Sequence, residues 1–157
     1  MGNGMWSLFI GSVFVAFLGF FLNSTHQPTA EQITPDALAA NMLVYHQTAL
    51  NYVIAHPAFT GTVPEGSMSF PNWYQKAANW VAVVGVAKVV VTYNSGTVPV
   101  SAVYLSKALH SYSDSDIGAG VSTADGKITP ALMEPTAGVP TPAGVPVGVV
   151  VAYSQIS

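Results

Sequence analysis

The amino-acid sequence predicts an α+β protein, in which one N-terminal transmembrane helix is followed by a small domain with a mainly antiparallel sheet and two helices. Two observations predict this class. An uncharged apolar run occupies Met5–Leu22, and the segments after it do not alternate regularly between helix and strand. Regular alternation is typical of parallel α/β sheets, whereas an irregular order favours an antiparallel sheet with helices packed beside it.

The run Met5–Leu22 is predicted to be a membrane anchor. It carries no charge, and as a helix it would be about 27 Å long, close to the hydrocarbon thickness of a bilayer. A cleaved signal peptide is the alternative, but it would need a basic residue before the apolar core and a small-x-small cleavage site, and both are missing. We therefore expect residues 1–22 to form a single-pass anchor. Its main apolar side chains are Met5, Trp6, Phe9, Phe14, Phe17, Phe20 and Leu22.

The same run contains a pattern that allows helices to associate. Ser12 and Ala16 are four residues apart and lie between Gly11 and Gly19. Small residues at this spacing permit two membrane helices to approach closely. A homo-oligomer formed through the anchor is therefore one expectation from the sequence.

Residues 23–34 are polar and include Pro28, so we expect a juxtamembrane linker. A helix is predicted to begin directly after it. Thr34 can cap the helix, Pro35 suits the first helical position, and Asp36 favours the positive end of the helix dipole.

Apolar residues recur after Pro35 at alternating spacings of four and three until Pro57, which predicts a helix over residues 35–55. The members of this apolar stripe are Leu38, Met42, Tyr45, Ala49 and Tyr52. His46 falls beside the stripe, and we expect its side chain to be solvated.

The next segments predict two strands and a second helix. Trp80–Gly85 and Lys88–Tyr93 are short, β-branched and bounded by turn residues, as strands are. Residues 89–91 are consecutive valines, so the second strand should be covered on both faces. Val100–Tyr112 follows a mostly helical period.

The C-terminal part predicts three more strands. Gly118–Thr123 and Lys127–Leu132 resemble a β-hairpin around a turn at Asp125–Gly126. Pro135–Pro146 is rich in proline and glycine and is expected to be extended or looped. Val147–Tyr153 should form the last strand, so that residues 35–157 make up one domain.

The composition argues against several classes of function. The chain has four Lys or Arg residues, all of them lysine, against seven acids, so nucleic-acid binding is not expected. No Walker-type or Rossmann glycine pattern is present, and without cysteine there are no disulfides or thiolate zinc sites. None of the four histidines has the metal-ligand spacing of i and i+4. We therefore expect no cofactor and no bound metal.

The sequence gives little support to the hypothesis that the protein is an enzyme. Ser67 or Ser69 could be drawn into a triad with His56 and Glu65, but residues this close in sequence rarely converge in that way. The nucleophile-elbow pattern Gly-x-Ser-x-Gly is also missing. We expect a protein that is not an enzyme, with an anchored envelope hydrolase using His56 or His110 as an alternative.

One stretch, His56–Gln75, interleaves prolines with aromatic residues. Prolines pre-set the backbone, and aromatic side chains either bury large areas in a core or supply most of the binding energy at an interface. We name the key residues of this stretch the aromatic belt: Phe59, Phe70, Pro71, Trp73 and Tyr74. The sequence leaves open whether the belt is core or contact surface.

Several segments together resemble a known family. The helix segment NMLVYHQTALNYVIAHP, the segments FTGTV and FPNWY, and the final PVGVVVAY are similar to the PilM-type proteins of plasmid-encoded thin, type IVB pili. The resemblance covers most of the chain. It implies a non-enzymatic component of a pilus or conjugation-associated assembly machine in the bacterial inner membrane. It also implies a periplasmic domain that contacts pilins or other assembly proteins.

A minor pilin is the alternative within the same machinery, because a pilin also has an apolar N-terminal helix and a small α+β head. Pilins usually carry a glutamate early in the apolar segment, but Met5 to Phe9 contain no acid. Pro28 and Pro35 would also interrupt the long helix that packs a filament.

Overall fold

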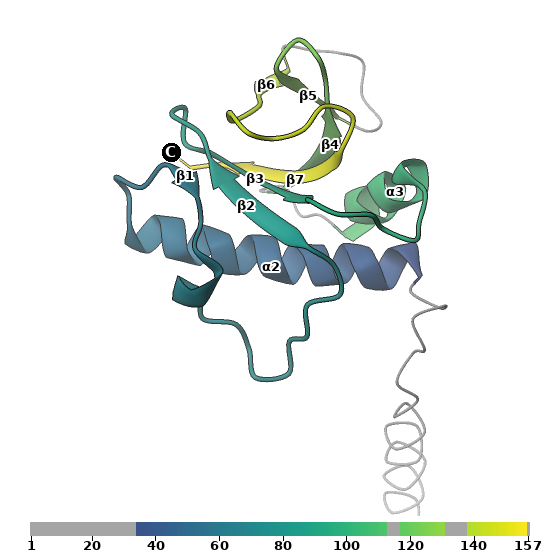
Figure 1. Cartoon of the computed structure of the whole chain (residues 1–157), viewed down its shortest axis with the longest axis horizontal. Helices are drawn as coiled ribbons and strands as arrows, with labels where there is room; N and C mark the ends of the chain where they lie inside the picture. Colours follow the sequence, from purple (N-terminus) through teal and green to yellow (C-terminus); the bar gives the residue numbers. More distant parts are fainter. Residues whose placement is uncertain (1–33, 113–116, 131–137, 157) are drawn as a thin grey trace, which may run out of the picture. The chain divides into compact units, whose positions relative to one another are not determined.

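The computed structural model describes residues 34–112, 117–130 and 138–156, which belong to one compact unit. They form a seven-stranded antiparallel sheet and two α-helices, so the predicted α+β class is confirmed for this part of the chain (Figure 1). The predicted anchor and most of the predicted linker lie outside the described residues. Of the helices that are described, none is both long and apolar enough to cross a membrane.

The long helix α2 spans Pro35–Ala55, as predicted. Thr34 caps it, because the Thr34 hydroxyl accepts a 3.2 Å hydrogen bond from the N–H of Ala37. The residues of the apolar stripe are buried or, for the last of them, half-buried: Leu38, Met42, Tyr45, Ala49 and Tyr52.

The sheet has the strand order β1-β2-β3-β7-β4-β5-β6. The last strand of the chain therefore lies at the centre and pairs with β3 and β4. The strands are β1 Gly61–Thr62, β2 Trp80–Val84, β3 Val89–Asn94, β4 Gly118–Ser122, β5 Lys127–Pro130, β6 Val139–Pro140 and β7 Val150–Gln155.

Two features of the sheet differ from the sequence prediction. The last strand begins at Val150 rather than Val147, because Gly148 adopts a φ of 80°, a turn conformation that belongs to the preceding loop. The edge strands β1 and β6 were not predicted. Each is two residues long, which is too short for an alternating pattern to be recognised.

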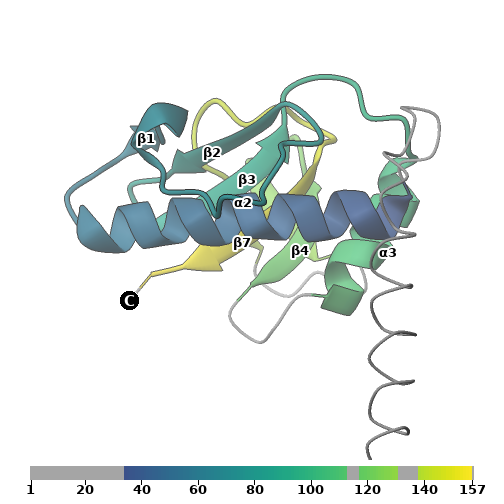
Figure 2. The same cartoon turned by 90° about the horizontal axis from the view of Figure 1, so that it is seen from below.

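The helices α2 and α3 (Ala102–Tyr112) lie on one face of the sheet (Figures 1 and 2). Strand β3 shows the division between the two faces. Val90 packs with the residues under the helices, whereas Val89 and Val91 belong to a second apolar cluster on the opposite side. The prediction that this strand is covered on both faces is confirmed.

The second apolar cluster is covered by the C-terminal part of the chain. Ile128 of β5 is fully buried in it beside Val151. The loop before β7 folds back over the same side, where the Tyr93 hydroxyl donates a 3.3 Å hydrogen bond to the carbonyl of Gly144. The sheet thus has a helical side and a side covered by its own strands and loops.

His46 is fully buried between α2 and the sheet, so the expectation of a solvated side chain is wrong. One ring nitrogen is hydrogen-bonded to the Thr92 hydroxyl of β3 at 2.9 Å, and the other to the Ser154 hydroxyl of β7 at 3.0 Å. The buried face of α2 extends beyond the stripe, because Ala39 and Leu50 are buried as well. His46 lies on this buried face, where two hydroxyls of the sheet supply the hydrogen bonds that water would otherwise make to its ring.

Lowering the pH should destabilise the domain through His46. Burial lowers the pKa of His46 to about 3 from its ordinary value of 6.5. Below pH 6.5 the unfolded chain therefore takes up a proton that the folded chain does not bind. Stability falls as the pH decreases from about 6.5 toward 3, by about 1.4 kcal/mol per pH unit. Between pH 7 and pH 5 we expect a loss on the order of 2 kcal/mol in urea unfolding followed by near-UV circular dichroism.

His46→Gln is the matched control, since glutamine can bond to both hydroxyls and does not titrate in this range. The variant should start from lower stability at pH 7 and lose less on going to pH 5. Equal losses in the two proteins would show that His46 is not the source of the pH dependence.

Candidate functional site

The aromatic belt of the sequence is divided in the structure. Its first member, Phe59, is half-buried against the C-terminal part of α2. There it meets Tyr52 edge-on, with ring centroids 5.4 Å apart. Phe59 therefore belongs to the packing around the helix end.

The other members lie on the segment 68–79, which we call the Trp73 loop. Phe70 and Tyr74 are half-buried and stacked, with centroids 4.8 Å apart, and Phe70 also contacts the ring of Tyr45 at 5.4 Å. Pro71 is exposed, and Trp73 is 72 % exposed. The loop thus combines packed rings at its base with one projecting indole.

Asn41 of α2 forms hydrogen bonds with the Trp73 loop and with Trp80, the first residue of β2. The Asn41 Oδ1 accepts hydrogen bonds from the indole N–H of Trp80 at 2.7 Å, from the N–H of Ala77 at 3.0 Å and from the Tyr74 hydroxyl at 3.1 Å. Its Nδ2 donates a 2.7 Å bond to the carbonyl of Gln75. Both ends of the amide are used, so the loop has one preferred position on the helix.

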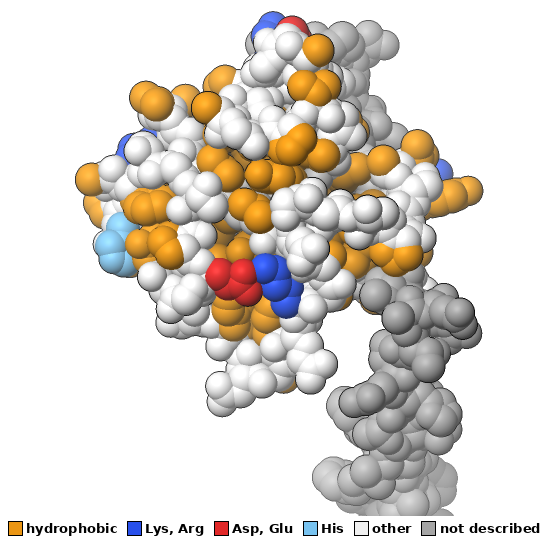
Figure 3. All heavy atoms as spheres, in the orientation of Figure 1, with side chains coloured by type: hydrophobic (Ala, Val, Ile, Leu, Met, Phe, Trp, Pro, Cys, Tyr) orange, Lys and Arg blue, Asp and Glu red, His pale blue; other side chains and the backbone are white. Residues whose placement is uncertain are grey.

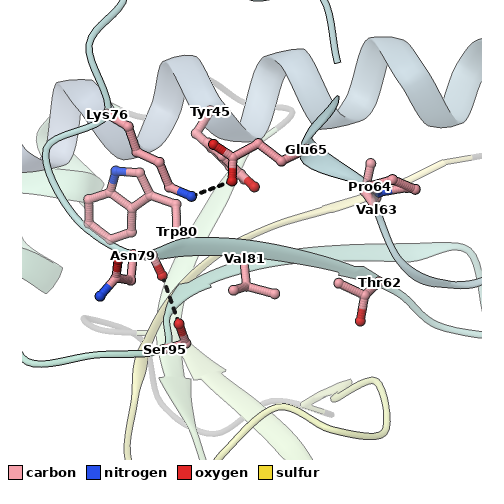
Figure 4. Close-up of a pocket in the computed structure, with 10 residues that line it drawn as sticks. All are labelled: Tyr45, Thr62, Val63, Pro64, Glu65, Lys76, Asn79, Trp80, Val81 and Ser95. Carbon is pink, nitrogen blue, oxygen red and sulfur yellow. Dashed lines mark hydrogen bonds and ion pairs between the residues drawn. The ribbon is translucent and has the colours of Figure 1, made fainter. Parts of the chain in front are cut away.

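A surface pocket of about 380 Å³ lies beside the Trp73 loop, between β2 and the short helix η2 (Glu65–Ser67) (Figure 4). Lys76 and Glu65 form an ion pair of 2.5 Å in it. The Lys76 ammonium also lies 5.2 Å from the centroid of the Tyr45 ring, a cation–π geometry. The two charges of the pocket therefore compensate each other.

The tyrosines at this place remain protonated. Burial, and to a smaller extent the charge of Glu65, raise the pKa of Tyr45 to about 12. Burial also raises the pKa of Tyr74, with smaller contributions from Tyr45 and Glu65. Both phenols are hydrogen-bond donors at physiological pH and not nucleophiles.

Two of the residues considered for a catalytic triad, His56 and Glu65, have other partners. The His56 ring is stacked on Tyr52 at 4.3 Å, and its Nδ1 donates a 2.8 Å hydrogen bond to the Tyr52 carbonyl. Glu65 is paired with Lys76. Across the described ranges, no group of three or more His, Asp or Glu side chains is placed to hold a metal ion.

The described surface is poor in charge on the side shown in Figure 3. Hydrophobic side chains are scattered there among uncharged polar groups and backbone, and charged groups are few. The Lys76–Glu65 pair contributes little to stability, because both side chains are partly exposed to solvent. Contacts made by this surface would therefore depend on shape, apolar area and hydrogen bonds.

Asn41 is the site residue that the sequence analysis missed. One feature of the sequence could have indicated Asn41. Asparagine is unfavourable inside a helix, because its side chain competes for the hydrogen bonds of the backbone, and Asn41 lies within the predicted helix. Such a residue needs a reason from tertiary structure. The identity of its partners, 33 to 39 positions away, could not be read from local pattern.

Comparison with known proteins gives one match. The family model described as PilM matches residues 12–153 of the chain. This range includes α2, the Trp73 loop and α3. No curated protein and no solved structure matches the chain.

Replacing Asn41 by alanine should release the Trp73 loop. The indole N–H of Trp80, a residue that is 1 % exposed, would lose its acceptor. Leaving a buried donor unpaired costs about 2 kcal/mol of unfolding free energy. We also expect the amide of Ala77 to exchange with deuterium faster by more than the global loss of stability accounts for.

Asn41→Asp is the control for this prediction. It keeps an acceptor for the three donors but places a carboxylate oxygen against the Gln75 carbonyl, so its effect on Ala77 exchange should be smaller. Unchanged protection of Ala77 in Asn41→Ala would contradict the proposed role of Asn41.

Proposed function

Because the chain belongs to the PilM family of pilus biogenesis proteins, we propose that it is a non-enzymatic inner-membrane component of a type IVB pilus assembly machine. In this proposal residues 1–22 anchor the chain and the described domain lies in the periplasm. The domain acts as a scaffold or adaptor that binds pilins or other assembly proteins.

The observation that supports this proposal best is the exposure of Trp73 on a fixed loop. A tryptophan that is 72 % exposed contributes little to its own fold. At an interface, however, the same side chain buries a large area at a low cost in side-chain entropy. Asn41 and the Phe70–Tyr74 stack hold the base of the loop, so the Trp73 side chain is already in position before a partner binds.

The chemistry of the loop also suggests what kind of contact it makes. Lys76 is the charged residue of the segment 68–79, and its ammonium is already paired with Glu65. A partner surface therefore has no free charge to complement here. It would need an apolar pocket for the indole and hydrogen-bonding groups for exposed polar neighbours such as Asn72.

Trp73→Ala should impair pilus assembly while the domain stays folded. We expect the unfolding free energy to change by less than about 0.5 kcal/mol, as for most exposed positions. The affinity for the partner should fall by about 30-fold if Trp73 contributes the roughly 2 kcal/mol of a hot-spot residue. Assembly is measured by counting surface pili, with the abundance of the variant checked by immunoblot.

Val86→Ala is the matched control, because Val86 is 92 % exposed in the turn between β2 and β3, away from the Trp73 loop. It should leave assembly unchanged. Normal piliation in Trp73→Ala cells would remove the Trp73 loop as the binding surface. Loss of the folded protein in that variant would instead assign Trp73 to the fold.

The cellular location separates an assembly component from a minor pilin. We expect a tagged full-length chain to stay with the inner membrane after filaments are sheared off, with an unprocessed N-terminus by Edman sequencing. A shortened N-terminus in the filament fraction would identify a pilin and overturn the proposal.

A further inference from the structure

The outward side of α3 carries large apolar side chains that the fold does not cover. Val103 is 70 % exposed and Tyr104 is 64 % exposed, although they stand in the first turn of a helix whose other side, with Leu105 and Leu109, is buried. Residues three and four apart share a side of a helix, so Lys107 lies beside both Val103 and Tyr104. We call Val103, Tyr104, Lys107 and Ser111 the outer face of α3.

The residue types of this outer face are those of a membrane–water interface. Aromatic residues with a polar end are enriched at the level of lipid headgroups, and lysine can keep its ammonium among phosphates while its stem covers apolar surface. The helix has no acidic residue, so Lys107 sets the sign of its charge. A cationic amphipathic face fits an anionic lipid surface.

Helix α3 lies near the N-terminal end of α2, where the predicted linker joins the domain. Figures 1 and 2 both place α3 beside the N-terminal end of α2, which starts at Pro35. The sequence places residues 23–34 between the predicted anchor and that point, and a fully extended linker of this length reaches about 40 Å. The linker joins the described domain at the start of α2, so the N-terminal end of this helix, with α3 beside it, stays within that reach of the predicted anchor.

We propose that the outer face of α3 rests on the headgroup layer of the membrane that holds the anchor. This inference depends on the proposed function, because it needs residues 1–22 to be inserted in a membrane. Val103 and Tyr104 enter the interface, and Lys107 pairs with lipid phosphate. The contact limits how the domain turns above the membrane and leaves the Trp73 loop available to a protein partner.

The absence of cysteine makes the test direct, since single cysteines can be introduced for labelling. The full-length chain is reconstituted in liposomes of phosphatidylethanolamine and phosphatidylglycerol that contain a nitroxide-headgroup lipid. A fluorophore is attached at Ser111→Cys, on the outer face of α3, or at Val86→Cys, in the β2–β3 turn. This turn lies at the opposite end of the sheet from α3 in Figures 1 and 2.

We expect the nitroxide lipid to quench the label at position 111 several-fold more than the label at position 86. Adding Val103→Ser and Tyr104→Ser should reduce quenching at position 111 to the level seen at position 86. Near-UV circular dichroism verifies that the double variant is folded. Because both positions are exposed on the domain, this loss would not result from a change in the core.

Flotation of the same liposomes at alkaline pH distinguishes failure of the proposed membrane anchor from failure of the proposed α3 contact. A chain that fails to float with lipid overturns the membrane anchor and the α3 contact with it. A chain that floats but shows equal quenching at both positions overturns the α3 contact alone. That result would assign the outer face of α3 to a protein partner.

Discussion

The domain is organised by two polar side chains that α2 extends in different directions. Apolar burial holds the helix against the sheet, but burial is not directional and would tolerate small shifts. His46 removes that freedom, because both ring nitrogens must meet the hydroxyls of Thr92 and Ser154 on neighbouring strands. Asn41, five residues earlier, does the same for the Trp73 loop. The position of the candidate binding surface therefore follows from where α2 lies on the sheet.

The elements with strong local signals could be predicted from the sequence, and those defined by distant partners could not. Thr34, Pro35 and Pro57 mark the ends of α2, and the valines of β2 and β3 identify these strands because β-branched runs between turn residues favour extended structure. His46 was misjudged because helical periodicity reports how apolar a side is and does not report hydroxyls on strands far away in sequence. The same limit concealed Asn41. The belt residues were recognised, but their division into packed rings and an exposed indole depends on contacts with Tyr45 and Asn41 that only the fold supplies.

The low charge of the chain, 7 % of its residues, shapes how the domain holds together and what it can bind. Its specific contacts come mainly from neutral groups: an imidazole, several side-chain amides and several hydroxyls. The ion pair of Lys76 with Glu65 is partly exposed and adds little stability. Neutral networks are only weakly screened by salt, in contrast to surface ion pairs. A domain built in this way is expected to keep both its fold and its contacts across a range of ionic strengths.

In the proposed arrangement, α2 connects the two exposed surfaces. The Trp73 loop is bonded to α2 at Asn41, and α3 packs beside the same N-terminal half of the helix (Figure 2). A rigid helix transmits position between the groups attached to it, since close-packed interiors do not deform continuously. If the outer face of α3 holds the domain at a defined angle to the bilayer, the same contact also sets the height and direction of Trp73. The membrane contact then determines the geometry of the protein contact. A partner would meet the indole in an orientation that is fixed relative to the membrane in which a pilus is assembled.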